Sequence, residues 1–175
     1  SDLTRRQVET VQQFLPSLMD SVPDLIWLKD NEGKYLACNH AFEQFFGAEE
    51  QDIVGRTDYD FVPRDLADFF RENDRAAMAA NAPLSNEEWV TFASDGRDAL
   101  LETIKTPMRA ANGRTVGILG IARDITLLRK AEIDLNERRE IYEAIVDQAM
   151  DIIVLMDAET GGFVEFNQAV TGRLG

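Results

Sequence analysis

Two side chains of this sequence stand out as candidates for chemistry, the single histidine His40 and the single cysteine Cys38. An imidazole can move protons or hold a metal ion. However, His40 follows Asn39, which suits a helix N-cap, and precedes an apolar helical stretch, so a polar or capping role at the surface is favoured. Cys38 falls on an expected strand, where we interpret it as a small core hydrophobe rather than a reactive thiol.

Catalytic and metal-binding sets with a recognisable spacing are missing from the sequence. It contains no Ser/His/Asp set, no His/Cys/carboxylate cluster at metal spacing and no glycine-rich phosphate loop. We therefore expect no catalytic residue, no metal site and no enzyme activity in this chain.

Aromatic side chains offer a different chemistry, the lining of an apolar cavity that binds a small molecule. The candidate lining residues are Trp27, Phe42, Phe46, Tyr59, Phe70 and Trp89, with Tyr59, Asn73 and Glu88 as polar anchors. Such a set is more often plain core, and both interpretations stay open. A ligand held there should be small and carry few charges, because Arg56 and Lys105 are the main candidates for buried positive charge.

Composition limits the partners and the setting of the chain. The 175 residues include 18 Lys and Arg against 32 Asp and Glu, a formal charge of −14. This balance argues against a nucleic acid or an anionic membrane as the main partner. A single cysteine, no window suited to a membrane span and no signal-peptide pattern predict a cytoplasmic segment, although the longer protein could be anchored elsewhere.

The hydrophobic pattern predicts an α+β domain with one five-stranded antiparallel sheet and its helices on one face. Strands are expected at residues 25–28, 34–38, 84–92, 98–108 and 115–123, with turns at glycine-containing segments between them.

Helices are expected before, within and after this sheet. The first covers residues 2–20, with Pro16 as an interruption. A short helix starts after Asn39 and ends at Gly47. A longer helix covers 63–81, with Pro63 in its first turn and one face formed by Leu66, Phe69, Phe70, Asn73 and Ala77.

Residues 126–150 form a further expected helix, with apolar positions that alternate in steps of three and four. The positions are Leu128, Ala131, Leu135, Tyr142, Ile145 and Ala149, with the polar Arg138 as the one break. This is a heptad pattern, typical of helices that pair. We expect a dimer seam formed by Leu128, Leu135, Tyr142 and Ile145.

The chain also repeats itself at a distance of about 127 residues. Residues 24–30 (DLIWLKD) are echoed by 151–157 (DIIVLMD), and the hairpin and short helix that follow are echoed as well. We interpret this as tandem copies of one domain, the second truncated. The predicted organisation is an N-terminal helix at 1–20, a domain at 21–126, a helical linker at 127–150 and the truncated start of a second domain at 151–175. Because its hairpin lacks the rest of a sheet, we expect the second copy to be held by other protein, through a second chain or strand addition.

An ordered set of short motifs resembles the PAS sensory domain. The motifs are Asn39-His40-Ala41-Phe42, Gly47, Ile53-Val54-Gly55-Arg56-Thr57, Ser94-Asp95-Gly96, Lys105-Thr106-Pro107, Gly113-Arg114-Thr115-Val116-Gly117 and Ala122-Arg123-Asp124-Ile125-Thr126. The resemblance covers roughly residues 20–126, and 147–175 resembles the beginning of a second PAS domain. It implies a bacterial signalling protein with an output domain, usually a histidine kinase or a diguanylate cyclase, outside this chain.

The resemblance also bears on relay and cofactors. In the family, the region of Asp124, Ile125 and Thr126 couples the sheet to the exit helix. Asp124 can also cap that helix or pair with Arg123, and an ordinary cap does not exclude the coupling role, so both interpretations stay open. Haem-bearing members usually supply a histidine from the long helix, and residues 63–81 contain none. Covalent flavin members need a cysteine after the short helices and photoactive-yellow members need one in the loop regions, and this sequence has none at those places. Haem and covalent flavin are therefore disfavoured, whereas a non-covalent flavin or small metabolite stays open.

Three functions follow from these patterns. The main hypothesis is a sensory and homodimerisation module that relays a signal through helix 126–150 to an output domain. The second is a receptor for a small molecule or non-covalent flavin. The third is a ligand-free protein-interaction domain.

Overall fold

The structure is a computed structural model that describes residues 2–149 and 154–166. It divides into two compact units, Ser1–Thr126 and Leu127–Gly175. Each unit is described by itself.

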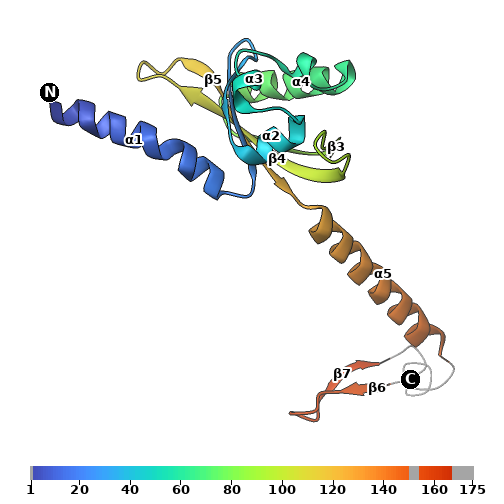
Figure 1. Ribbon diagram of the computed structural model, residues 1–175. Coiled ribbons are helices and arrows are strands. Elements are labelled where there is room, and N and C mark those ends of the chain that lie inside the picture. Colours follow the sequence, from blue (N-terminus) through green and yellow to red (C-terminus); the bar gives the residue numbers. More distant parts are fainter. Residues whose placement is uncertain (1, 150–153, 167–175) are drawn as a thin grey trace. The chain divides into compact units, whose positions relative to one another are not determined.

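A five-stranded antiparallel sheet forms the centre of the first unit (Figure 1). Its strands are β1 (Leu25–Asp30), β2 (Tyr35–Cys38), β3 (Leu84–Thr91), β4 (Asp98–Arg109) and β5 (Thr115–Asp124). They lie in the order β2-β1-β5-β4-β3, so β1 of the first hairpin pairs with the last strand, β5. The expected sheet is confirmed.

The helices between β2 and β3 gather against one face of this sheet (Figure 1). They are α2 (His40–Phe46), α3 (Glu50–Ile53), the 3₁₀ turn η1 (Asp58–Asp60) and α4 (Arg64–Ala80). As expected, α2 begins at Asn39, whose side chain accepts a hydrogen bond from the Phe42 amide, and ends at Gly47 with φ 67°. Aromatic rings from α2 fill the space between helices and sheet, and they form the core with β1 and β2.

The buried face of α4 differs from the predicted one. Ala67, Phe70, Arg71, Asp74 and Ala77 are buried, whereas Phe69 is 38% exposed and Leu66 and Asn73 are only partly covered. The predicted face is therefore confirmed for Phe70 and Ala77 and wrong for Phe69, and the prediction missed Arg71 and Asp74, which the helix turns inward. Pro63 immediately precedes the helix as its N-cap.

The N-terminal helix α1 (Asp2–Ser21) is continuous through Pro16. The predicted interruption was therefore wrong. Proline removes one backbone donor from the helix, and because α1 is exposed around Pro16, water can satisfy the carbonyl that is left without a partner.

The second unit contains most of α5 (Thr126–Gln148) and a hairpin of β6 (Val154–Met156) and β7 (Phe163–Phe166). Its register repeats the first hairpin. Met156 pairs with Phe163 after an irregularity at Leu155, just as Lys29 pairs with Tyr35 after one at Leu28. The equivalence of the two segments thus extends from sequence to strand pairing. Ile152, Ile153 and Gly175 lie outside the described residues. The expectation that other protein holds this hairpin therefore stays a prediction.

Candidate functional site

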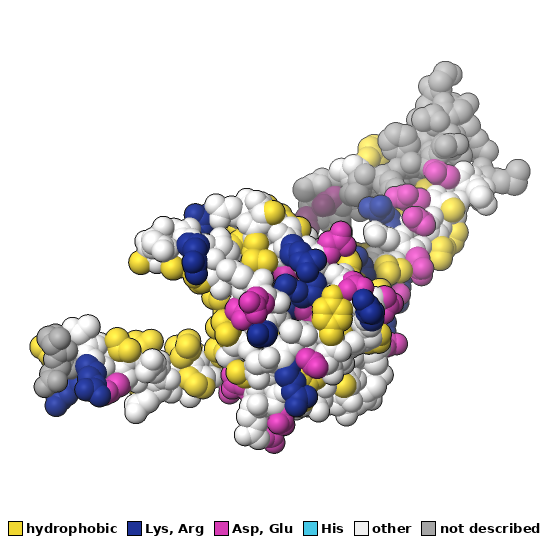
Figure 2. All heavy atoms as spheres, turned by 90° about the horizontal axis from the view of Figure 1, so that it is seen from above, with side chains coloured by type: hydrophobic (Ala, Val, Ile, Leu, Met, Phe, Trp, Pro, Cys, Tyr) yellow, Lys and Arg dark blue, Asp and Glu magenta, His cyan; other side chains and the backbone are white. Residues whose placement is uncertain are grey.

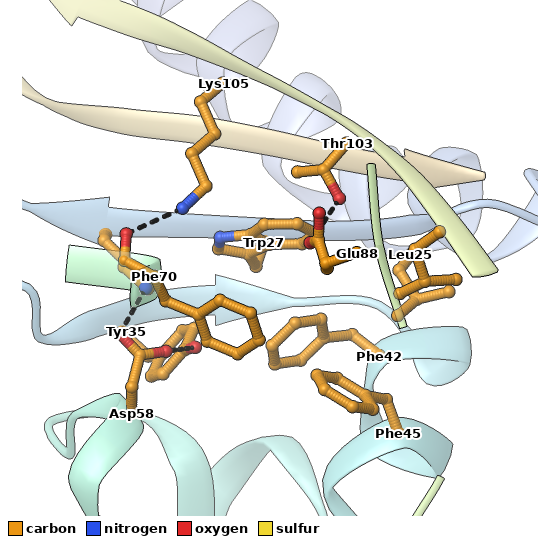
Figure 3. Close-up of a pocket in the computed structure, with 12 residues that line it drawn as sticks. Leu25, Trp27, Tyr35, Phe42, Phe45, Asp58, Phe70, Glu88, Thr103 and Lys105 are labelled. Atoms are coloured by element: carbon orange, nitrogen blue, oxygen red, sulfur yellow. Dashed lines mark hydrogen bonds and ion pairs between the residues drawn. The ribbon is translucent and has the colours of Figure 1, made fainter. Parts of the chain in front are cut away.

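A small cavity lies between the sheet and the helices (Figure 3). Its lining residues are Leu25, Trp27, Lys29, Tyr35, Phe42, Phe45, Asp58, Phe70, Glu88, Leu101, Thr103 and Lys105. The space open to the centres of water-sized molecules is about 20 Å³. This is enough for a water molecule, whereas drug-sized ligands occupy roughly 300–1,000 Å³.

Trp27 is placed in this cavity by the glycine beside it. Trp27 on β1 pairs with Gly120 on β5, and a Cβ atom added to Gly120 would overlap the indole. The ring therefore occupies the space that a side chain on β5 would take. Trp27 is 6% exposed, and within the described part of the chain its Nε1–H has no hydrogen-bond partner. A buried donor of this kind is costly unless something accepts its hydrogen bond.

One wall of the cavity is an ion pair between a strand and the η1 turn. Lys29 Nζ lies 2.6 Å from Asp58 Oδ2, and both side chains are buried. The Tyr35 hydroxyl donates to the other oxygen of Asp58. Burial, with a contribution from the Asp58 charge, raises the pKa of Tyr35 well above its usual value, so this phenol stays protonated and remains a donor.

Asp74 on α4 connects the same lysine to two further cations. Its carboxylate lies 3.0 Å from Lys29 Nζ, 2.7 Å from Lys105 Nζ and 3.3 Å from Arg71 Nη1. Lys105 also donates to the Phe70 carbonyl at 2.8 Å. Burial opposes the charge of Asp74, but Lys29 and Lys105 outweigh it and lower the pKa of the carboxyl.

Arg71 completes the cluster by covering the first hairpin. A Cβ atom on Gly33 would overlap its guanidinium group, and Gly33 has φ 88°. Both the close approach and the positive φ require glycine at this turn. The buried charges thus hold α4, η1 and the β1–β2 hairpin together.

Glu88 and Lys105 face the cavity with shifted pKa values. Burial raises the pKa of Glu88, although a hydrogen bond from Thr103 at 2.8 Å and the charge of Lys105 act against the shift. Burial lowers the pKa of Lys105, although Asp74 opposes it. The cavity therefore contains one acid and one base that are both displaced toward their neutral forms.

The structure brings together only some of the predicted binding residues. Trp27, Phe42 and Phe70 line the cavity, and so does the proposed anchor Glu88. Phe46 is buried behind it and stacks on Phe61, with ring centroids 4.6 Å apart.

The remaining predicted binding residues lie elsewhere. Tyr59 is 48% exposed and donates to Asp68, and Trp89 is 59% exposed beside a surface depression. These two assignments were wrong because aromatic character alone does not say which face a residue occupies. Asn73 is partly buried and does not line the cavity, although its Nδ2 has no partner among the described residues.

The charged members of the site were largely missed by sequence reasoning. Lys105 was identified as buried positive charge, but Arg56 is exposed. Strand alternation could have found Lys29, since it shares the inner face of β1 with Leu25 and Trp27. No local sequence pattern predicts that Asp58 and Asp74 are buried, because their burial depends on the lysines opposite them.

A second feature is the junction between the sheet and α5. The Leu100 carbonyl accepts from the Ile125 amide, and the Leu100 amide donates to Thr126 Oγ1, both at 2.9 Å. Asp124 accepts from the Thr126 amide at 3.0 Å and from Arg97 at 2.6 Å. The predicted cap is present, whereas the alternative pairing of Asp124 with Arg123 is not observed.

The remaining side chains of interest occupy separate places. Arg123 binds Asp24 instead of Asp124. His40 is exposed and its Nδ1 lies 2.8 Å from Glu43, while Cys38 is buried, and burial raises the pKa of its thiol to about 12. Among the residues that the structure describes, no group of three or more His, Cys, Asp or Glu could hold a metal ion. None of the described helices is long and apolar enough to cross a membrane.

A five-stranded sheet covered by helices on one face, with a small cavity between the two layers, defines an α+β domain. The chain belongs to the PAS family: the family model described as "PAS fold" matches residues 19–130. A PAS domain is a sensory rather than a catalytic unit, which agrees with signalling proteins among the relatives.

Three curated relatives illustrate this. The aerobic respiration control sensor protein ArcB of Escherichia coli is 33% identical over 130 residues, 74% of this chain and 16% of ArcB. The methanogenesis regulatory histidine kinase FilI of Methanothrix harundinacea is 27% identical over 143 residues, 82% of this chain and 16% of FilI. A diguanylate cyclase of Vibrio cholerae is 26% identical over 116 residues, 66% of this chain and 34% of that protein. The chain thus spans a minor part of each relative.

Solved structures agree on the fold. The PAS domain of BvgS from Bordetella pertussis is 30% identical, with a TM-score of 0.56 over 73% of this chain and 97% of that one. Vibrio cholerae VqmA, in a complex with ligand and DNA, is 24% identical, with a TM-score of 0.60 over 66% of this chain and 51% of VqmA. Since one structural neighbour binds DNA, the fold itself does not exclude a nucleic-acid partner, and our exclusion rests on the charge of this chain alone.

Proposed function

We propose that residues 21–126 sense a change at the cavity and relay it through β4 to α5, and from there to an output domain in the same protein. The output is a histidine kinase or diguanylate cyclase, as among the relatives. The single buried cysteine suits a reducing, cytoplasmic setting.

One observation carries this proposal. Leu101 lines the cavity, and its neighbour Leu100 exchanges two hydrogen bonds with Ile125 and Thr126 at the start of α5. The Leu100 carbonyl belongs to the peptide group that joins Leu100 to Leu101, so a displacement of the Leu101 backbone moves the acceptor that binds Ile125. A change in the cavity can therefore alter the hydrogen bonds at the start of α5 through the backbone of two consecutive residues of β4.

Hydrogen exchange tests the relay. Leu101→Ala should raise the exchange rates of the amides of residues 125–128 at least about fivefold, which corresponds to roughly 1 kcal/mol. Ile118→Ala is the matched control, since it truncates an equally buried aliphatic side chain on β5 that does not adjoin the junction. Equal exchange at 125–128 in both variants would refute the relay.

Thr126 provides a second test of the same junction. Thr126→Val removes the hydroxyl that binds Leu100, whereas Thr126→Ser keeps it. We expect faster exchange at residues 125–128 for the valine variant only. Similar behaviour of both variants would show that the hydroxyl plays no part.

Homodimerisation belongs to the same proposal. The four seam residues of α5 are exposed in the single chain: Leu128 60%, Leu135 69%, Tyr142 41% and Ile145 62%. A heptad row of this kind is stable when a second helix covers it. We infer that a second copy covers it, and that relay takes place within a dimer.

A small-molecule receptor is the second candidate function, supported by the unpartnered indole N–H of Trp27. A ligand there would present an acceptor to Trp27 and contact the rings of Phe42 and Phe70. A flavin does not fit the cavity in its present state, given its volume of about 20 Å³. Native mass spectrometry and an absorbance spectrum of fresh protein test this candidate: an unliganded, colourless sample would favour the ligand-free interaction domain.

A further inference from the structure

Three carboxylates lie at or beside the cavity, and two of them are bound to lysines. Asp58 lies 2.6 Å from Lys29 Nζ, and Asp74 lies 2.7 Å from Lys105 Nζ. Glu88 lines the same cavity (Figure 3) but makes no ion pair with any residue that the structure describes. A carboxylate that is partly removed from water without a cation in contact favours its neutral, protonated form.

Neutral side chains bind both oxygens of Glu88. Thr103 Oγ1 donates to one oxygen at 2.8 Å, and Asn86 Nδ2 donates to the other. An ionised carboxylate only accepts hydrogen bonds, whereas a protonated one also donates. Uptake of a proton by Glu88 therefore alters this pair of hydrogen bonds, one of which joins it to β4.

The backbone of Glu88 lies beside the junction with the exit helix. In the sheet, Glu88 on β3 is the pairing partner of Leu101 on β4. The preceding residue, Leu100, carries the two hydrogen bonds to Ile125 and Thr126 at the start of α5. A change at Glu88 therefore acts on the segment of β4 that binds this helix.

Protons can reach Glu88 from solvent without an opening of the domain. β3 is the last strand of the sheet, and Glu88 is only partly buried, whereas Asp58 and Asp74 are fully buried. On the outside of the domain, acidic and basic side chains lie interspersed (Figure 2), so that water and nearby cations stabilise an exposed carboxylate. Glu88 has neither full hydration nor a bound cation.

The other titratable groups around the cavity have charged partners of their own. Tyr35 donates to Asp58, and Arg71 lies 3.3 Å from Asp74. The elements α2 and β5 contribute no charged residue to the lining. The groups that face Glu88 are, element by element, Lys29 of β1, Tyr35 of β2, Asp58 of η1, Arg71 and Asp74 of α4 and Lys105 of β4. Glu88 is the member of this set whose proton is not fixed by an ion pair.

We propose that Glu88 is a proton-binding site through which the domain responds to a fall in pH: Glu88 takes up a proton, its hydrogen bonds to Asn86 and Thr103 change, and the junction with α5 changes with them. This inference rests on the relay proposed above and names the proton as its input. Burial raises the pKa of Glu88, although Thr103, Lys105 and Asn86 act against the shift, and this direction agrees with the geometry.

Nuclear magnetic resonance of the full chain, from about pH 4 to about pH 8, tests the proposal. The carboxyl carbon of Glu88 should titrate with a midpoint above the usual 4.5, and the amide signals of Leu100 and Ile125 should shift with the same midpoint. These shifts are read in the folded protein, so a change in stability alone does not produce them.

Glu88→Gln is the variant that mimics the protonated form, because glutamine is uncharged and both donates and accepts. Its Leu100 and Ile125 signals should lie near those of the unsubstituted chain at low pH, and the part of their shift that follows pH should fall at least about fivefold. Glu72→Gln is the matched control, since Glu72 is exposed on α4, and it should leave the titration of both amides unchanged.

The outcomes separate this inference from the relay. An ordinary midpoint for Glu88, or amide shifts that persist in Glu88→Gln, would overturn the proton site. If Leu101→Ala speeds exchange at residues 125–128 while the Leu100 and Ile125 signals ignore pH, the relay stands and Glu88 is not its input. If both signals follow Glu88 but Leu101→Ala behaves like Ile118→Ala, the proton site is supported and the route through Leu101 is refuted.

Discussion

The indole of Trp27 fills the space above Gly120, its pairing partner on β5. The glycine therefore determines the position of the one buried donor in the cavity that lacks an acceptor among the described residues. This relationship links the sequence of the last strand to the shape of the candidate site.

Gly120→Ala should displace Trp27 and destabilise the domain. The added methyl group overlaps the ring, and overpacking of this kind costs roughly 1–3 kcal/mol. Urea unfolding followed by circular dichroism measures the change. Gly162→Ala is a suitable control because a Cβ there meets only Thr160 Oγ1 at 3.4 Å, and it should change stability by less than about 0.5 kcal/mol. If both variants unfold alike, the indole is not held by Gly120.

Lys29→Met should strongly destabilise the domain, even though the second copy has a methionine at the equivalent position. The second copy has Met156 at the equivalent position, but in the first copy Lys29 is bound to Asp58 and Asp74. Removing one member of a buried ion pair leaves charge without a partner and costs roughly 3–5 kcal/mol. The free energy of unfolding from urea titrations should fall by this amount.

Lys34→Met is the matched control for that loss. Lys34 forms an exposed pair with Glu32, and such surface pairs contribute about 0–1 kcal/mol. A loss for Lys29→Met no larger than the loss for Lys34→Met would contradict a structural role of the buried cluster.

The adjacent residues Asp58 and Tyr59 show which parts of the structure can be predicted from the sequence and which cannot. The fold was predictable because alternation, glycine turns and the Asn39 cap are local patterns with local causes. The site was only partly predictable: Tyr59 was chosen for its ring, yet Tyr59 is exposed and Asp58 beside it is fully buried. Burial of Asp58 depends on Lys29, which is distant in sequence, so no local pattern could reveal it.

Glu88→Gln should change the pH dependence of stability. The pKa of Glu88 is raised in the folded protein, mainly by burial, so the protonated form is favoured there. Its stabilising contribution is complete below the usual pKa, near 4.5, and is lost as pH rises through the folded value. Glutamine does not ionise, so the stability of Glu88→Gln relative to the unsubstituted chain should increase from pH 4 to pH 7.

Urea unfolding across this pH range measures the effect. A difference between Glu88→Gln and the unsubstituted chain that stays flat with pH would mean that burial does not raise the pKa of Glu88 in the folded protein.

Leu135→Asp should convert a dimer into a monomer. Leu135 lies at the centre of the α5 seam and is 69% exposed in the single chain, so a charge there costs little in the monomer but is buried in a paired helix. Sedimentation equilibrium should show at least a tenfold weaker dimer. Ile133→Asp adds the same charge to an exposed aliphatic position of the same helix, outside the seam, and should leave the dimer intact. If both variants weaken association equally, the charge itself and not the seam is responsible; if neither does, α5 does not form the dimer contact and the relay must operate within one chain.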